Sequence, residues 1–122
     1  MSNPIGDVNK FMVAAGQTVF GDNTEQAILY RKLIEEEYRE LMKAFAEGDD
    51  TEILDACFDL PWVCFAYAMS RGWDMHSAWV EGARSNLDKI DPTTGSVIRR
   101  DDGKILKPEG WLPPNFSQFV KK

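Results

Sequence analysis

Two long helical patterns joined by a very short connection constrain this fold more than any other feature of the sequence. Apolar residues recur at helical spacing over residues 25–47 and again over residues 51–71. Between them stand only Gly48, Asp49 and Asp50. Because so short a connection turns the chain straight back, we expect the two helices to pack side by side and antiparallel.

The ends of these two helices carry recognisable signals. Thr24 and Thr51 are suitable N-caps, and Gly72 follows the second helix as a C-cap. Pro61 lies inside that second helix, where it removes one backbone hydrogen bond. We expect Pro61 to kink the helix rather than break it.

Two shorter helical patterns flank this pair. The first begins at Asp7, its expected N-cap, and the last follows Asp74 over residues 75–90. Together the patterns predict an all-α fold: a four-helix bundle over about residues 7–90, within a single domain of residues 1–122.

The remaining tail, residues 91–122, is richer in proline and glycine. Two apolar pairs, at 97–98 and 105–106, flank Asp102-Gly103, which is a strong turn signal. The tail is therefore predicted to form a short β-hairpin followed by an extended, proline-rich end.

Charge and composition limit the possible partners and compartment. The net charge of −6 argues against a nucleic-acid polymer, because binding its backbone requires Lys and Arg. No apolar run reaches the roughly 18 residues of a membrane span, and the first residues lack a signal-peptide pattern. We expect a cytoplasmic protein without a membrane partner. Cys57 and Cys64 are two helical turns apart and are expected to be reduced and buried.

Acidic residues lie where the first long helix needs apolar ones. Its apolar stripe, followed from Leu33 to Leu41, passes through Glu37. Glu36 and Glu40 lie one turn apart beside it, so that three carboxylates share one patch. A buried carboxylate costs several kcal/mol unless it is paired or bound to metal, so this patch predicts a divalent cation.

The second long helix repeats the anomaly. Glu52, Asp55 and Asp59 form one stripe at spacings of three and seven residues, among apolar neighbours. In an antiparallel pair this stripe can face the first one. Oxygen ligands without histidine or cysteine favour Mg²⁺ or Mn²⁺, which bind phosphates and activate water.

At this point the sequence resembles the MazG-like all-α nucleoside triphosphate pyrophosphohydrolases, particularly their phage-type branch. The segments EEEYREL and EILDACFDL resemble the two acidic helices of that family, and RSNLDKI with DGKILKPEGWLPPN resembles its phosphate-binding helix end and tail. The resemblance implies hydrolysis of a nucleoside triphosphate to the monophosphate and pyrophosphate, with two or more Mg²⁺ or Mn²⁺ ions per site.

The resemblance also assigns roles to particular residues. Glu36 would hold or deprotonate the attacking water. The implied metal ligands are Glu37, Glu40 and Asp59, and the implied phosphate contacts are Asn86, Lys89, Lys104 and Lys107. Ala56 stands where many family members have a Glu, so Asp55 or Glu52 would complete the metal site, and Asp55 is favoured.

Recognition of the base falls to the first helix, where the candidates are Asn9, Phe11, Met12 and Gln17. The phage-type branch includes enzymes acting on dGTP or GTP, which we favour, and others acting on dUTP or dCTP. A phosphoribosyl-ATP or modified-nucleotide pyrophosphohydrolase and a non-enzymatic, metal-binding helical module are the alternatives. We also expect a homodimer or homotetramer, because the helical body is too thin to bury all its aromatic side chains.

Overall fold

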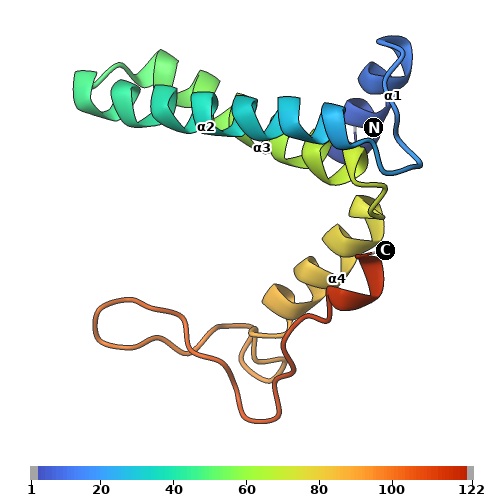
Figure 1. The fold of residues 1–122 in the computed structure, drawn as a ribbon. Coiled ribbons are helices and arrows are strands. Elements are labelled where there is room, and N and C mark those ends of the chain that lie inside the picture. Colours follow the sequence, from blue (N-terminus) through green and yellow to red (C-terminus); the bar gives the residue numbers. More distant parts are fainter. Residues whose placement is uncertain (1–2, 121–122) are drawn as a thin grey trace. The chain divides into compact units, whose positions relative to one another are not determined.

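The computed structural model of the chain describes residues 3–120, and the elements it contains are helical (Figure 1). They are α1 (Pro4–Ala14), α2 (Thr24–Glu47), α3 (Asp50–Ser70), α4 (Met75–Leu87) and the short 3₁₀ helix η1 (Ser117–Phe119). The all-α class with four α-helices is confirmed over these residues. The chain forms two compact units, one up to Met75 and one from His76 to Val120, and each is described by itself.

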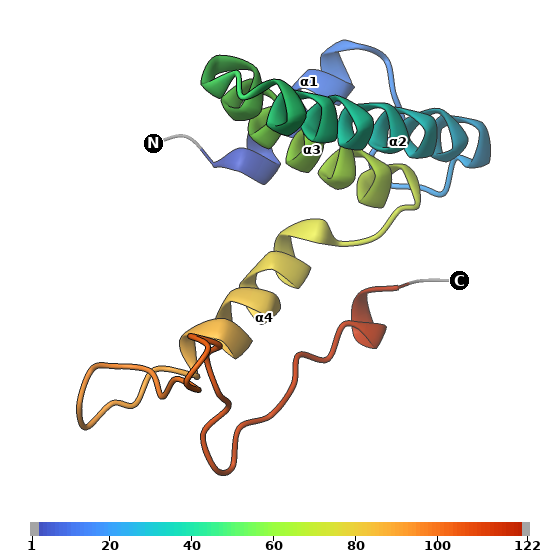
Figure 2. The same ribbon diagram turned by 90° about the vertical axis from the view of Figure 1, so that its left-hand side faces the viewer.

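In the first unit, α2 and α3 run side by side in opposite directions (Figures 1 and 2). α1 packs against α3. The buried core of this unit joins all three helices and consists of Ile5, Val8, Met12, Tyr30, Val63, Ala66 and Met69. The antiparallel pair predicted from the short connection is therefore confirmed.

The caps of α2 and α3 lie earlier than expected. The Asn23 side chain accepts a hydrogen bond from the N–H of Gln26 at 3.1 Å, so Asn23 rather than Thr24 caps α2. The Asp49 carboxylate accepts from the N–H groups of Thr51 and Glu52 at 3.1 and 3.2 Å, which places Thr51 inside α3. Both predictions of a threonine cap were wrong because Asn and Asp stand just upstream and cap more strongly.

The ends of the outer helices also differ from prediction. Asn3, not Asp7, caps α1, because its side-chain oxygen accepts from the N–H groups of Ile5 and Gly6 at 3.1 Å each. α4 ends at Leu87, three residues before the predicted end. α3 continues through Pro61 as one helix, as expected for a proline that does not break it.

The junction after α3 is tied to the start of α2 by a small polar network. The Gln26 amide donates to Ser70 Oγ and to the Thr18 carbonyl, both at 2.8 Å. Ser70 Oγ in turn donates to the Ala66 carbonyl at 2.8 Å, and Ser70 is fully buried. Gly72 adopts the left-handed conformation (φ 72°), as its predicted C-cap role requires.

The second unit consists of α4 and the tail that returns along it. The Phe116 ring lies against Gly82, where an added Cβ would meet it at 3.3 Å. The N–H of Asn115 donates to the Glu81 carboxylate at 2.8 Å, and Glu81 also pairs with Arg84 at 2.9 Å. These contacts hold the proline-rich segment beside the helix.

The predicted β-hairpin of the tail was wrong, because residues 3–120 contain no strand. The chain does reverse near Gly103, with a single bridge between Arg99 and Ile105. Ile98 and Ile105 remain 55% and 45% exposed, so that pairing would bury little apolar surface. A two-stranded ribbon without such burial is marginal in water.

The surface of α3 departs from expectation in two respects. Cys57 and Cys64 are free, as expected, but exposed rather than buried. α3 also has the length and composition of a membrane span, with a mean hydropathy of 1.3 over a window of which 33% is buried. A single such helix is weak evidence, since core helices of soluble proteins meet the same criteria. The expectation that no segment is long and apolar enough is therefore corrected, whereas the absence of a membrane partner stays a prediction.

Candidate functional site

The acidic stripes of α2 and α3 meet across the helical pair, and Glu37 and Asp59 are the half-buried acids among them. The Glu37 side chain is half-buried, and its Oε2 atom is buried without a hydrogen-bond partner. The pKa of Glu37 is raised to about 7, first by burial and then by the charge and hydrogen bond of Glu40. The charges of Asp59 and Glu36 raise it further. The carboxylate of Asp59 on α3 therefore raises the pKa of Glu37 on α2.

Asp59 shows the same effect from the opposite helix. It is half-buried, and burial is the main cause of its raised pKa. The charge and hydrogen bond of Asp55 contribute next, followed by the charge of Glu40. Five of the acids singled out from the sequence on these helices thus act on one another electrostatically: Glu36, Glu37, Glu40, Asp55 and Asp59.

A groove of about 430 Å³ opens beside these acids, toward the turn that joins α2 and α3. Ala56, where a family Glu was expected, is buried and leaves room in the groove wall. Both Glu52 and Asp55 line the groove, so each remains a candidate for the missing carboxylate. The remaining lining residues are Glu40, Lys43, Ala44 and Glu47.

Glu47 is an acid that the sequence interpretation missed. It follows Glu40 by seven residues, which is two helical turns, and it lines the same groove. The same i, i+7 spacing that linked Glu52 to Asp59 would have found it.

The donor chemistry of the groove, together with Glu37 next to its lining residue Glu40, fits a hard divalent cation. Carboxylate oxygens suit Mg²⁺ and Mn²⁺, and the unpartnered Oε2 of Glu37 is an acceptor that a cation would satisfy. Their raised pKa values also mean that the surroundings disfavour the charged form of Glu37 and Asp59, which a bound cation would stabilise. Within residues 3–120, however, no three Asp, Glu, His or Cys side chains have their donor atoms gathered around one point.

The residues expected to contact a base lie on α1, apart from Gln17 in the segment that follows it, and they differ in accessibility. Met12 is fully buried in the core, so that its side chain offers no surface to a ligand. Phe11 is 54% exposed and contacts the Trp62 ring edge to face, with centroids 5.7 Å apart. Asn9 is half-buried, and Gln17 accepts a hydrogen bond from the Tyr30 hydroxyl at 2.6 Å.

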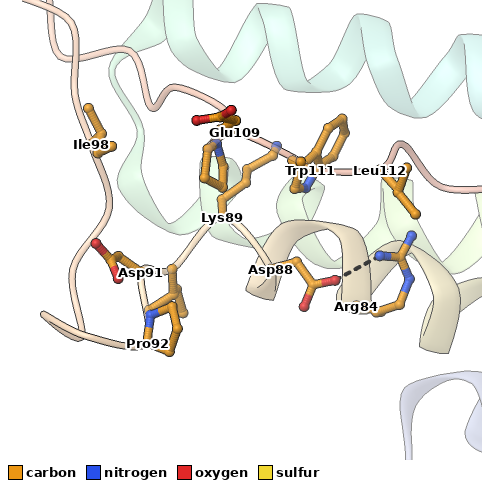
Figure 3. Close-up of a pocket in the computed structure, with 12 residues that line it drawn as sticks. Arg84, Asp88, Lys89, Asp91, Pro92, Ile98, Glu109, Trp111 and Leu112 are labelled. Carbon is orange, nitrogen blue, oxygen red and sulfur yellow. Dashed lines mark hydrogen bonds and ion pairs between the residues drawn. The ribbon is translucent and has the colours of Figure 1, made fainter.

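In the second unit, three of the four residues expected to bind phosphate lie together. Lys89 Nζ donates to Asn86 Oδ1 at 3.0 Å, and the ammonium groups of Lys89 and Lys107 both lie over the ring of Trp111. Lys104 lies in the turn near Gly103. Of these four residues Lys89 lines the pocket of Figure 3, and Asn86, Lys104 and Lys107 are not among its lining residues. Trp111 was not among the predicted residues, because its contact with α4 bridges a long stretch of sequence.

The sequence pattern of the phosphoribosyl-ATP pyrophosphohydrolase family matches residues 16–86, which is more than half of the chain. The match contains α2, α3 and nearly all of α4, and it ends at Asn86. No curated protein matches the chain. The family is one of the all-α, MazG-like nucleotide pyrophosphohydrolases, which confirms the resemblance at that level and indicates a pyrophosphohydrolase enzyme. The facing acidic helices thus lie within the matched segment, and the chain belongs to the phosphoribosyl-ATP pyrophosphohydrolase family.

Proposed function

We propose that this protein hydrolyses a (deoxy)nucleoside triphosphate to the monophosphate and pyrophosphate with Mg²⁺ or Mn²⁺, and that dGTP and GTP are the substrates to test first. The observation that carries the proposal is the buried, unpartnered carboxylate oxygen of Glu37 among facing acids. Family membership supports the type of reaction, since a pyrophosphohydrolase releases pyrophosphate from a nucleotide.

The proposed metal ligands are Glu37, Glu40, Asp55 and Asp59, for two or more ions. When bound, such ions neutralise phosphate charge and lower the pKa of a coordinated water. The four carboxylates come from both helices, so a cation between them would relieve the repulsion that raises the pKa values of Glu37 and Asp59.

Glu36 is the proposed general base. It is exposed on the rim, next to Glu37, where it can receive a proton from water. The water oxygen forms a bond to the α-phosphorus, and the bond from that phosphorus to the bridging oxygen breaks. The proton passes to Glu36, and pyrophosphate leaves with the bond electrons.

The remaining proposed contacts orient the nucleotide. Asn86, Lys89, Lys104 and Lys107 would bind its phosphates, because the acidic groove offers a single lysine, Lys43, among four carboxylates. Asn9 and Phe11 are the accessible candidates on α1 for the base, by hydrogen bonding and stacking respectively. The proposed setting is the cytoplasm, as part of nucleotide-pool control, and that of the host cell if the protein is encoded by a phage.

Phosphoribosyl-ATP is the second candidate substrate, and the family match favours it. Hydrolysis of this compound breaks the same kind of phosphoanhydride and also releases pyrophosphate. Phosphoribosyl-ATP differs from dGTP and GTP in its base and in the phosphoribosyl group that the base carries, so competition in one assay distinguishes the candidates.

The decisive experiment incubates the purified protein with each dNTP, each NTP and phosphoribosyl-ATP, with Mg²⁺ or Mn²⁺. Pyrophosphate and monophosphate are then measured. We expect turnover that Glu37→Gln and Asp59→Asn each reduce at least 100-fold, whereas Glu35→Gln, on the exposed face, retains it. Absence of cleavage of every nucleotide, with metal-dependent thermal stabilisation retained, would favour the non-enzymatic metal-binding module.

We also propose that the protein is a homodimer or homotetramer. Leu54 and Phe58 on α3 are 72% and 60% exposed, and Phe45 on α2 is 53% exposed. An apolar surface of this kind marks an interaction site. A second copy of the chain would bury it and would account for the apolar composition of α3.

A further inference from the structure

The indole ring of Trp111 occupies a fixed position in the second unit. Its Nε1–H donates to the Ser85 carbonyl at 2.7 Å, and Ser85 is 4% exposed. The residue follows Gly110, whose φ of 80° turns the chain, and the Trp111 N–H donates to the Pro108 carbonyl at 3.1 Å. The ring is therefore anchored through both its side chain and its backbone.

Two ammonium groups lie over this ring. Lys107 Nζ is 4.9 Å and Lys89 Nζ 5.4 Å from the ring centroid, so their separation cannot exceed the sum of these distances. Among residues 3–120 neither lysine forms a salt bridge, whereas Arg84 pairs with two carboxylates. A contact with a half-buried aromatic face neutralises no charge, so both ammonium groups can still bind an anion.

A pocket of about 440 Å³ lies beside the ring, within the size range of small-molecule sites (Figure 3). Lys89 and Trp111 line this pocket, whereas Lys107 lies over the ring without being one of the lining residues. Three carboxylates line it, and two of them are already engaged. Asp88 accepts from Arg84 at 2.8 Å, and Asp91 accepts from the Thr93 N–H at 2.8 Å. Glu109 is the third, and its charge would oppose an anion.

We propose that this pocket is an oligophosphate-binding subsite in which Trp111 is the positioning residue that holds Lys89 and Lys107 within reach of one phosphate chain. The inference rests on the proposed function, because the chain would be that of the nucleotide or of released pyrophosphate. Holding both ammonium groups at one anchored ring reduces the side-chain freedom that they must lose on binding.

The test uses the full-length protein in EDTA, where the acidic groove has no cation to attract a phosphate. Isothermal titration calorimetry measures binding of tripolyphosphate, pyrophosphate, dGTP and deoxyguanosine. We expect the three phosphate compounds to bind and deoxyguanosine not to bind. Tripolyphosphate binding distinguishes an anion site from a base site, and comparison with pyrophosphate and dGTP separates the two sources of the phosphate chain.

The variants separate positioning from general charge and from folding. The double change Lys89→Met and Lys107→Met should weaken tripolyphosphate binding at least 10-fold. Arg99→Met removes an exposed charge elsewhere in the unit and should weaken this binding less than 2-fold. Trp111→Leu should weaken tripolyphosphate binding about 5-fold, and Trp111→Phe should weaken it less. In a protein that already carries Lys89→Met and Lys107→Met, neither change at Trp111 should weaken binding further. Glu109→Gln keeps the anchored ring and should tighten binding.

Two results would overturn the proposal. One is the absence of tripolyphosphate binding in EDTA, or equal weakening by Arg99→Met. The other is a loss from Trp111→Leu that persists at full size without the lysines, which would indicate a purely structural role. With an active enzyme, Trp111→Leu should raise KM and leave kcat nearly unchanged. A Glu36→Gln variant that loses hydrolysis but keeps tripolyphosphate binding would separate failure of the catalytic proposal from failure of this one.

Discussion

Replacing Glu37 by glutamine should stabilise the metal-free protein at alkaline pH. Below pH 4.5 the carboxyl is protonated in both the folded and the unfolded state, and it contributes no difference. Between pH 4.5 and about 7 the unfolded state loses its proton first, so wild-type stability falls as the pH rises. Above about pH 7 the full cost of the buried charge is present, and Glu37→Gln removes it.

The size of this effect follows from the pKa difference. A rise from 4.5 to about 7, at 1.36 kcal/mol per unit, sets an upper limit of about 3.4 kcal/mol. Because Glu37 is half-buried and water screens part of the repulsion, we expect about 1 to 2 kcal/mol. The variant should therefore exceed the wild type in free energy of unfolding by this amount at pH 8, and by only a few tenths of a kcal/mol at pH 4.5.

Urea unfolding followed by circular dichroism, in EDTA at both pH values, measures the effect. Glu35→Gln is the matched control, because Glu35 is exposed and its ion pairs with Arg31 and Arg39 are long, near 4 Å. Adding Mg²⁺ at pH 8 should then stabilise the wild type but not Glu37→Gln. A variant no more stable than wild type in EDTA at pH 8, or one that Mg²⁺ stabilises equally, would refute the reasoning about Glu37.

Three further outcomes test the packing. Gly72→Ala should lower the free energy of unfolding by about 2 kcal/mol, because its φ is left-handed and an added Cβ meets the backbone preceding α2 at 3.0 Å. Gly48 is also left-handed but has open space around it, so Gly48→Ala should cost about 1 kcal/mol in the same urea assay. Ser70→Ala should cost about 1 to 2 kcal/mol, because the buried Gln26 amide contact is lost, and thermal unfolding would reveal it. Phe58→Asp should lower the oligomer mass measured by light scattering without unfolding the helices; an unchanged mass would exclude α3 from the interface.

The sequence was most informative where structure depends on local periodicity. Glu37 could be identified because its position on an apolar helical stripe follows from spacing alone. Its interaction with Asp59 was also predictable, since the short turn after α2 leaves one way for α3 to pack. Family-level resemblance and these local patterns pointed to the same residues.

Long-range contacts could not be predicted in this way. Trp111 reaches Ser85 across 26 residues, and nothing in its neighbourhood indicates that contact. The prediction of a hairpin in the tail was wrong for a related reason. Gly103 supplies a turn, but too little apolar surface is buried beside it to stabilise two strands. The helix starts were misplaced because several capping residues stand in succession, and sequence alone does not rank Asn23 against Thr24 by geometry.

The short turn between α2 and α3 has a consequence for how quickly the proposed site assembles. Every proposed ligand lies between Glu37 and Asp59, within one helical hairpin, so the contacts that bring them together are close in sequence. Hairpins with such low contact order close early and fast, whereas the tail must travel further to meet α4. The acidic groove is therefore among the first features that a newly made chain can form, before the tail that carries Lys104 and Lys107 packs against α4.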